Sequence, residues 1–140
     1  MSEYWRLICL SVSLVVTAPL LAAEADPPGR VGRISLAHEG TQVRIGDSSA
    51  TGTAVLNWPL TTGALIETAS GARTEARIGS TTLQIDGGTS LEFLELSDER
   101  IWLRLGRGSV VLGIQNPAHA AEAALDTPQG RLRFDAPGTY

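Results

Sequence analysis

The amino-acid sequence predicts an all-β fold, and three observations support that prediction. Short segments alternate apolar and polar residues, which is the pattern of strands with one buried face. The 15 glycines and six of the seven prolines lie after residue 25 and are spread along the rest of the chain, as frequent tight turns require. No stretch of roughly twelve residues keeps a helical period. We therefore expect about ten short strands in a compact sandwich, barrel or solenoid-like stack.

The alternation places apolar side chains at every second position of each expected strand, so that each set lines one face. In chain order the sets are Ile34 and Leu36; Val43 and Ile45; Ala64, Ile66 and Thr68; Ala76 and Ile78; Leu83 and Ile85; Ile101, Leu103 and Leu105; Val110, Leu112 and Ile114; and Leu132 and Phe134. In residues 91–96 the apolar parity changes between Phe93 and Leu94. A β-bulge there would keep the four apolar side chains inward, and a strand covered on both faces would do the same.

Glycine and short polar residues predict the turns between these strands, because glycine adopts the positive φ that tight turns need. The expected turns are Asp86-Gly87-Gly88, Ser97-Asp98-Glu99 and the hairpin Gly106-Arg107-Gly108. The alanine-rich segment 118–125 is the one candidate for a helix. Pro117 and Pro128 flank it, and proline restricts the residue before it to extended backbone, so we expect at most a short turn.

The first 25 residues have the features of an export signal. Arg6 precedes an apolar run, Leu7 to Ala18, and this stretch of roughly 12 to 15 residues is short for a bilayer span. Ala23-Glu24-Ala25 supplies the small-x-small pattern that signal peptidase accepts. We expect a signal helix in residues 1–25, cleaved after Ala25, with Ala23 as the second candidate. The alternative is an uncleaved membrane anchor.

The rest of the chain has the composition of one small acidic domain. The 140 residues include 15 acidic and 11 basic side chains, and the one cysteine, Cys9, lies in the expected leader. These values exclude a large multidomain enzyme, a disulfide-stapled mini-protein and a strongly cationic nucleic-acid binder. The proline-rich residues 26–30 predict a short linker, and residues 31–140 predict a single β domain.

No pattern predicts a catalytic residue, a cofactor or a metal site, so we expect a protein that is not an enzyme. A metal site needs several ligands close together, and the expected domain has only His38 and His119 and no cysteine. Ser48 follows Gly46-Asp47, a placement similar to that of a serine-hydrolase nucleophile, but its Ser-, Thr- and Gly-rich surroundings are typical of a loop. A small exported hydrolase using His38 or Ser48 is the remote alternative.

Two further motifs suggest chemistry only weakly. Residues 106–108 begin like a dinucleotide fingerprint, but the third glycine and the following helix are missing. Glu92, Glu95, Asp98 and Glu99 contain enough carboxylates for a glycosidase pair. Four acids around a turn are more typical of a solvated edge.

Arg100, Trp102 and Arg104 form the most specific candidate site in the sequence. On a strand the three share one face, so an exposed indole would lie between two guanidinium groups. Stacked arginine and tryptophan can hold an anionic polymer, a sugar ring or a partner strand. The alternative is a solvated outer face in which arginine stems cover the indole. We interpret the trio as a possible partner-binding face.

From Trp58 onward the residues resemble the FecR domain family. The motifs that carry this resemblance are Asn57-Trp58-Pro59-Leu60-Thr61-Thr62-Gly63, Thr68-Ala69-Ser70-Gly71-Ala72-Arg73-Thr74-Glu75-Ala76, Ile78 to Asp86, Leu103-Arg104-Leu105-Gly106-Arg107-Gly108-Ser109-Val110, Asp126-Thr127-Pro128-Gln129-Gly130 and Pro137-Gly138-Thr139-Tyr140. Pro27 to Ile34 resemble an exported bacterial subgroup that carries this domain. The resemblance covers almost the whole expected domain. It rests on turn glycines and strand patterns and implies nothing about catalysis.

The resemblance implies an all-β module, periplasmic or secreted, that binds a protein or envelope polymer. Signal sensing is the role of the family's best-known members. Known regulators of the family have a cytoplasmic sigma-binding region before a membrane helix, whereas only six residues precede the apolar run here. We also expect a chain truncated at Tyr140, where the family's last strand would start. The alternative function is a structural fragment of a larger exported protein that docks through an exposed strand edge. We expect no nucleic-acid partner, and membrane contact only through an uncleaved leader.

Overall fold

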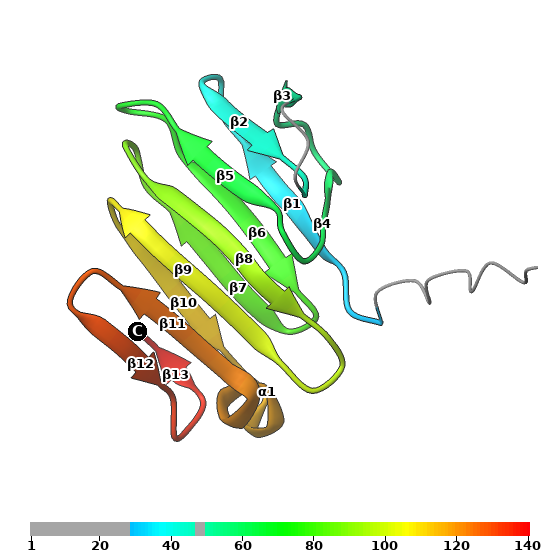
Figure 1. The fold of residues 1–140 in the computed structure, drawn as a ribbon, viewed down its shortest axis with the longest axis vertical. Helices are drawn as coiled ribbons and strands as arrows, with labels where there is room; N and C mark the ends of the chain where they lie inside the picture. The colour runs from blue at the N-terminus through cyan, green and yellow to red at the C-terminus, as the bar shows by residue number, and fades with distance from the viewer. Residues whose placement is uncertain (1–28, 47–49) are drawn as a thin grey trace, which may run out of the picture.

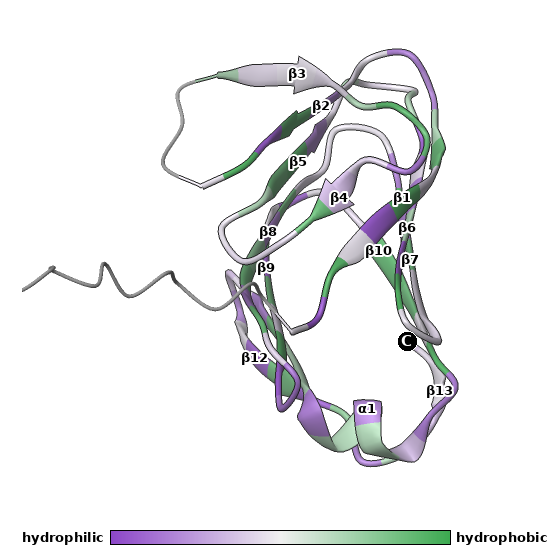
Figure 2. Cartoon of the chain, turned by 90° about the vertical axis from the view of Figure 1, so that its right-hand side faces the viewer, coloured by the Kyte–Doolittle hydropathy of each residue, from purple (hydrophilic) through white to green (hydrophobic). Residues whose placement is uncertain are grey.

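The computed structural model describes residues 29–46 and 50–140, and the expected signal segment lies outside these residues. Within them, thirteen strands form two sheets, accompanied by one short helix. The two sheets face each other and the described strands do not close into a barrel (Figures 1 and 2). The all-β prediction is confirmed, with two facing sheets as its architecture. Three strands that the sequence did not predict have only two or three residues, too short to show alternation. A fourth, Ala123–Thr127, corrects the expectation of at most a short turn, because it begins within residues 118–125.

Both sheets are built mainly from antiparallel neighbours. The six-stranded sheet has the order β13 (Gly138–Thr139), β10 (Val110–Ile114), β7 (Thr81–Ile85), β6 (Thr74–Ile78), β1 (Gly32–Ala37) and β4 (Pro59–Leu60). The seven-stranded sheet has the order β12 (Gly130–Arg133), β11 (Ala123–Thr127), β9 (Ile101–Arg107), β8 (Ser90–Leu96), β5 (Leu65–Thr68), β2 (Thr41–Arg44) and β3 (Thr51–Thr53). β9 and β11 pair in parallel, because the chain between them passes through the other sheet.

One expected turn is corrected by this topology. The prediction of a hairpin at Gly106-Arg107-Gly108 is wrong, because β9 and β10 belong to different sheets. Residues 86–88 likewise lead from one sheet to the other, between β7 and β8. Residues 97–99 do form a hairpin, in which the backbone N–H of Ser97 donates to the carbonyl of Arg100 at 3.0 Å. The strands on either side of a turn alternate in the same way whether the turn closes a hairpin or leads to the other sheet. A local pattern therefore does not distinguish a hairpin from a crossing between sheets.

Residues 86–88 and 106–108 are the two crossings between the sheets, and buried threonine hydroxyls bind the backbone at both. The Oγ1 of Thr68 donates to the carbonyl of Asp86 at 2.5 Å and accepts the backbone N–H of Thr89 at 2.9 Å. The Oγ1 of Thr89 donates to the carbonyl of Ser109 at 3.1 Å and accepts the N–H of Ser109 at 3.0 Å. Thr89 is fully buried, and its bonds satisfy backbone groups that leave the ladders at the crossings.

The core lies between the sheets and contains most of the side chains that the alternation placed inward. Its largest fully buried members are Phe93, Ile34, Leu60, Ile66, Ile78, Leu83, Ile85, Leu91, Leu96, Ile101, Leu103 and Leu112. Of the two alternatives for residues 91–96, the bulge is present, since the register of β8 against β9 shifts between Phe93 and Glu95. It changes the parity so that Phe93 and Leu96 are both buried, while Leu94 is only half-buried. The bulge therefore keeps three of the four apolar side chains inward.

Two residues of the expected inward sets are exposed. Leu36 is 38% exposed, because the register of β1 against β6 shifts between Ile34 and Leu36. Leu132 is 51% exposed although it lies opposite the buried Leu125. Its strand, β12, is at the edge of the seven-stranded sheet, where one side lacks a neighbour among the described strands.

Helix α1 (Pro117–Glu122) corrects the expectation of a turn in this segment. Pro117 occupies the start of the helix, where a missing N–H costs nothing, so it favours the helix instead of preventing it. The side chain of Asn116 caps this end by accepting the N–H of Ala118 at 2.9 Å. α1 lies across one end of the two sheets (Figure 2), and Ala120 packs into the core. The helix thus covers that end of the core.

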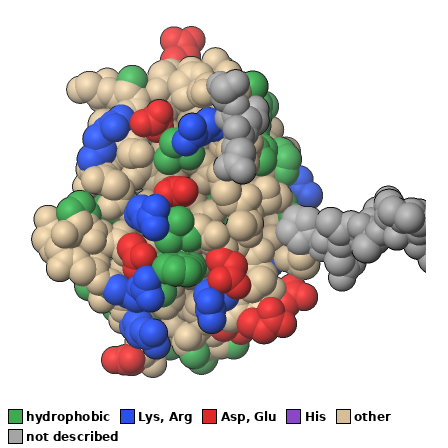
Figure 3. All heavy atoms as spheres, in the orientation of Figure 1, with side chains coloured by type: hydrophobic (Ala, Val, Ile, Leu, Met, Phe, Trp, Pro, Cys, Tyr) green, Lys and Arg blue, Asp and Glu red, His purple; other side chains and the backbone are tan. Residues whose placement is uncertain are grey.

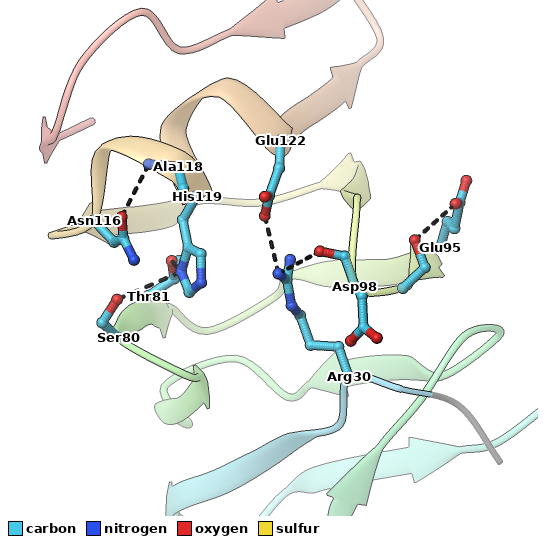
Figure 4. A network of polar contacts seen from close by, with 10 residues as sticks. Arg30, Ser80, Thr81, Glu95, Asp98, Asn116, Ala118, His119 and Glu122 are labelled. Carbon is cyan, nitrogen blue, oxygen red and sulfur yellow. Dashed lines mark hydrogen bonds and ion pairs between the residues drawn. The ribbon is translucent and has the colours of Figure 1, made fainter.

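Polar contacts fasten α1 to the strands on both sides (Figure 4). Nη2 of Arg30 lies 2.9 Å from Oε2 of Glu122 and donates to the carbonyl of Asp98 at 2.8 Å. Nδ1 of His119 lies 3.0 Å from Oγ1 of Thr81 in β7. The Arg30 and Glu122 side chains are 16% and 26% exposed, the least exposed ion pair among the described residues. Arg30 therefore connects the start of the domain to α1 and to the β8–β9 turn.

Replacing Arg30 with alanine is expected to lower the free energy of unfolding by about 2 kcal/mol, because it removes a shielded, charged hydrogen bond to Glu122 and a second to Asp98. The matched control is Arg33→Ala, since Arg33 is exposed and has no ion pair among the described residues. Urea denaturation of the purified proteins measures both changes. Equal losses in the two variants would contradict the anchoring role of Arg30.

Candidate functional site

The outer face of the seven-stranded sheet, which we call the outer face below, is covered by cross-strand ion pairs. Arginine and acidic side chains interleave over it in the space-filling view (Figure 3). The pairs join Arg100 to Glu95 at 3.1 Å, Arg104 to Glu92 at 3.2 Å, Arg107 to Glu67 at 3.1 Å, and Arg131 to Asp126 at 2.5 Å. Exposed pairs of this kind contribute little stability, about 0 to 1 kcal/mol each. Their main effect is to neutralise the arginines locally.

The predicted trio lies on this face, but its contacts differ from the expected arrangement. Trp102 is opposite Glu95 of β8, and Arg104 is opposite Glu92. The guanidinium groups of Arg100 and Arg104 bind these two glutamates instead of flanking the indole. Trp102 is half-buried, so its ring is less accessible than an isolated strand suggests.

The cation on the indole comes from another strand. Cζ of Arg131, in β12, lies 4.5 Å from the centroid of the Trp102 ring, within the range of a cation–π contact. Nε and Nη2 of the same guanidinium donate to the two carboxylate oxygens of Asp126 at 2.5 and 3.0 Å. Trp102, Asp126 and Arg131 together form what we call the Trp102 cluster. Its parts come from β9, β11 and β12, three adjacent strands of one sheet.

The contacts within the Trp102 cluster favour the charged form of Asp126. The hydrogen bonds from Arg131 lower the pKa of the Asp126 carboxyl below its usual value, and the nearby indole N–H of Trp102 acts in the same direction. That N–H nevertheless makes no hydrogen bond of normal geometry with any described residue. Because the pKa of Asp126 is lowered, the pair stabilises the folded protein at neutral pH. This contribution is lost as the pH falls below the usual aspartate range towards the lowered pKa.

Two hollows flank the Trp102 cluster, and Arg131 lines both. One, of about 520 Å³, lies towards Arg104, Gly106 and Pro128. The other, of about 330 Å³, lies between Trp102, Arg100 and Arg133. Ala124 is opposite both Trp102 and Arg133, and its small side chain leaves the space of the second hollow open. Tryptophan and arginine are among the side chains that most often dominate the binding energy of a protein interface. Here Trp102 and Arg131 lie between two hollows.

The other residues considered for chemistry do not come together. His38 is exposed, and its backbone N–H binds the carbonyl of Arg73 just before β6, whereas His119 lies beside Gly79 and Thr81 just after it. The two histidines are therefore at opposite ends of a five-residue strand. Ser48 lies outside the described residues.

The four carboxylates near the β8–β9 turn have the arrangement of a solvated edge. Glu92 and Glu95 are paired with arginines on the outer face, and Asp98 and Glu99 are exposed at the turn. Residues 29–46 and 50–140 contain no group of three or more His, Cys, Asp or Glu side chains placed to hold a metal ion. In the same residues, no helix has the length and apolar character needed to cross a bilayer.

Sequence reasoning identified Trp102 but missed Arg131 and Asp126. The missing information is the parallel pairing of β9 with β11, which connects residues about twenty positions apart through a helix. The hairpin of β11 and β12 then places Arg131 next to Asp126. Alternation placed Arg131 and Arg133 on one face of a strand without indicating its neighbour, and no strand was expected at Asp126.

Comparisons with protein-family models, with curated proteins and with solved structures gave no match to this chain.

Proposed function

We propose that this chain is an exported, non-catalytic, FecR-like module that binds a protein or a cell-envelope polymer in the periplasm or outside the cell. The Trp102 cluster on the outer face is the binding site. The single observation that supports this most is the stack of Arg131 on Trp102 between two hollows. Export and the relation to FecR domains rest on the leader and motifs of the sequence.

The cluster is suited to recognition because it is preorganised. Asp126 holds the guanidinium of Arg131 by two hydrogen bonds, so little side-chain freedom remains to be lost when a partner binds. The indole supplies a large contact area with few rotatable bonds. Most arginines of the outer face are neutralised by ion pairs. Among the described residues, the two arginines of this face that have no acidic partner are Arg44 and Arg133. Such a nearly neutral face favours a specific partner over nonspecific attraction of polyanions.

A non-catalytic role is favoured by the distribution of reactive groups. Acid–base or nucleophilic catalysis needs groups within hydrogen-bonding reach of one another. In the described part of the chain, the polar contacts of the His119 ring are with the hydroxyls of Ser80 and Thr81, at 3.4 and 3.0 Å, through the same Nδ1 atom. These hydroxyls fasten α1 to the β6–β7 turn, which gives this histidine a structural role.

The double variant Trp102→Ala/Arg131→Ala is expected to bind a partner from cell-envelope extract at least about tenfold more weakly, as loss of a Trp–Arg hot spot predicts. The measurement is capture on immobilised protein followed by titration of the captured partner. The matched control, Arg33→Ala/Arg77→Ala, removes two exposed arginines from the other sheet, where they lie opposite each other. Undiminished capture by the first variant would refute the proposed site, and thermal melts confirm that both variants are folded.

A further inference from the structure

Strand β12 leaves one border of the seven-stranded sheet open. It is the last strand in the sheet order, and all four of its residues are exposed. Figure 1 shows β12 at the margin of the fold, with β11 on its inner side. A strand with one neighbour presents a row of backbone N–H and C=O groups that can pair with another chain. Among the described residues, no strand covers this row.

The inward side chain of β12 also lacks cover. Leu132 lies opposite Leu125, so both side chains point to the inner face. Leu125 is 5% exposed and Leu132 is 51% exposed. The difference arises because, in the sheet as described, β11 has strands on both sides and β12 has one on a single side. A strand added beside β12 would therefore bury Leu132 if it placed an apolar side chain on the inner face.

The outward side chains of β12 are both cationic. Arg131 and Arg133 lie opposite Asp126 and Ala124, on the outer face. Arg131 is paired with Asp126, whereas Arg133 has no acidic partner among the described residues. The hollow that Arg133 shares with Arg100 and Arg131 also contains Glu99 and Glu122, of which Glu122 binds Arg30. An acidic side chain opposite Arg133 would complete a cross-strand pair at the one arginine of β12 that lacks one.

Charge also argues against a second copy of the same strand as the occupant. In an antiparallel pairing of β12 with itself around Leu132, Arg131 of one copy would lie opposite Arg133 of the other. Like charges directly opposite are destabilising. The other sheet borders are poorer sites, because β3 and β13 have no charged residue and β4 begins with a proline, which has no N–H.

We propose that β12 accepts an extended segment of a protein partner as an additional strand, with acidic side chains on the outer face alternating with apolar side chains on the inner face. Backbone hydrogen bonds provide affinity in this mode, and alternate side chains provide specificity. Leu132 and Arg133 are the residues that select the apolar and acidic positions. This inference rests on the proposed function as a binding module and specifies the partner as a protein with an acidic, apolar-alternating segment.

The test uses the purified full chain and a fluorescent peptide of about ten residues that alternates glutamate and valine. Fluorescence anisotropy is expected to show binding that weakens at least about tenfold in Arg133→Glu. A peptide with lysine in place of glutamate is expected to restore binding to that variant. Arg33→Glu, which changes an exposed arginine of the other sheet, is expected to have no effect.

Amide hydrogen exchange locates the bound peptide. The exchange of β12 amides is expected to slow on peptide binding. N-methylation of every second peptide residue removes the N–H groups along one edge of the peptide strand. Of the two peptides methylated in this way, the one that loses the edge facing β12 is expected not to bind. Protection at another border, or equal binding of both peptides to Arg133→Glu, would overturn the β12 site. If envelope capture still depends on Trp102 and Arg131 while the peptide does not bind β12, this inference fails and the proposed function stands. If the peptide pairs with β12 but envelope capture is unchanged in Trp102→Ala/Arg131→Ala, the proposed outer-face site fails instead.

Discussion

Replacing Phe93 with alanine is expected to lower the free energy of unfolding by about 3 to 5 kcal/mol, a large share of the stability of a domain of this size. Phe93 is fully buried and lies in β8, near the middle of the seven-stranded sheet. Truncation removes its contacts with the core and leaves a cavity that packed side chains fill only partly.

Leu94→Ala is the matched control for Phe93, because the two residues are adjacent and differ in burial through the bulge. We expect this substitution to cost about 1 kcal/mol, as for a half-buried side chain. Equilibrium denaturation with urea measures both variants. A loss at Leu94 as large as that at Phe93 would show that the bulge is misplaced, since an inward Leu94 requires a different register.

Replacing Gly108 with alanine is expected to destabilise the protein by about 3 kcal/mol and to lower the melting temperature by roughly 10 °C or more. Gly108 has a φ of +87°, which residues with a side chain rarely adopt. An added Cβ would also clash with the Oγ1 and Cα of Thr89, which holds the two crossings between the sheets. The substitution therefore combines backbone strain with overpacking.

Gly106→Ala provides the comparison for Gly108, two residues earlier in the same motif. A Cβ at Gly106 would have its nearest neighbour, the carbonyl oxygen of Ser90, at 3.8 Å, and the φ of Gly106 is not positive. We expect its melting temperature to change by no more than a few degrees. Similar losses for both glycines in a thermal melt would contradict the role assigned to the crossing.

The outer face and the edge of β12 share one structural element, because Arg131 and Arg133 lie on the edge strand. Arg131 is held by Asp126 and stacks on Trp102, while Arg133 has no acidic partner within residues 29–46 and 50–140. A partner strand beside β12 would therefore lie next to the Trp102 cluster. The proposed site and the proposed mode of binding are adjacent, and separate substitutions test them.

The charged side chains of β12 also limit its self-association. Exposed edge strands are prone to pair with copies of themselves, and charges along the edge oppose this. The apolar side chain of Leu132 is exposed at this edge. Its two neighbours in the strand, Arg131 and Arg133, point to the opposite face. Selection against a second copy and selection for an acidic partner therefore have the same physical cause.

Local sequence alone determined the strand character of most segments, most of the core and the position at which the parity of residues 91–96 changes. Period-two alternation identified Ile66, Ile78 and Leu83 as buried, because side chains at every second position of any strand share a face. The slip in parity between Phe93 and Leu94 likewise marked the bulge, which is a local feature of one strand. These properties depend only on neighbouring residues, and the sequence contains them.

Tertiary structure alone decided which strands are neighbours, and with them the candidate site. The alternation in β9 and β10 has the same form whether the turn between them is a hairpin or a crossing between sheets. Arg131 reaches Trp102 only because β11 pairs in parallel with β9 and β12 folds back beside it. Long-range pairing depends on how all strands together bury their apolar faces, so no local pattern specifies it. The exposed Leu132 follows from the same cause, since its burial is set by a neighbour that the described sheet does not have.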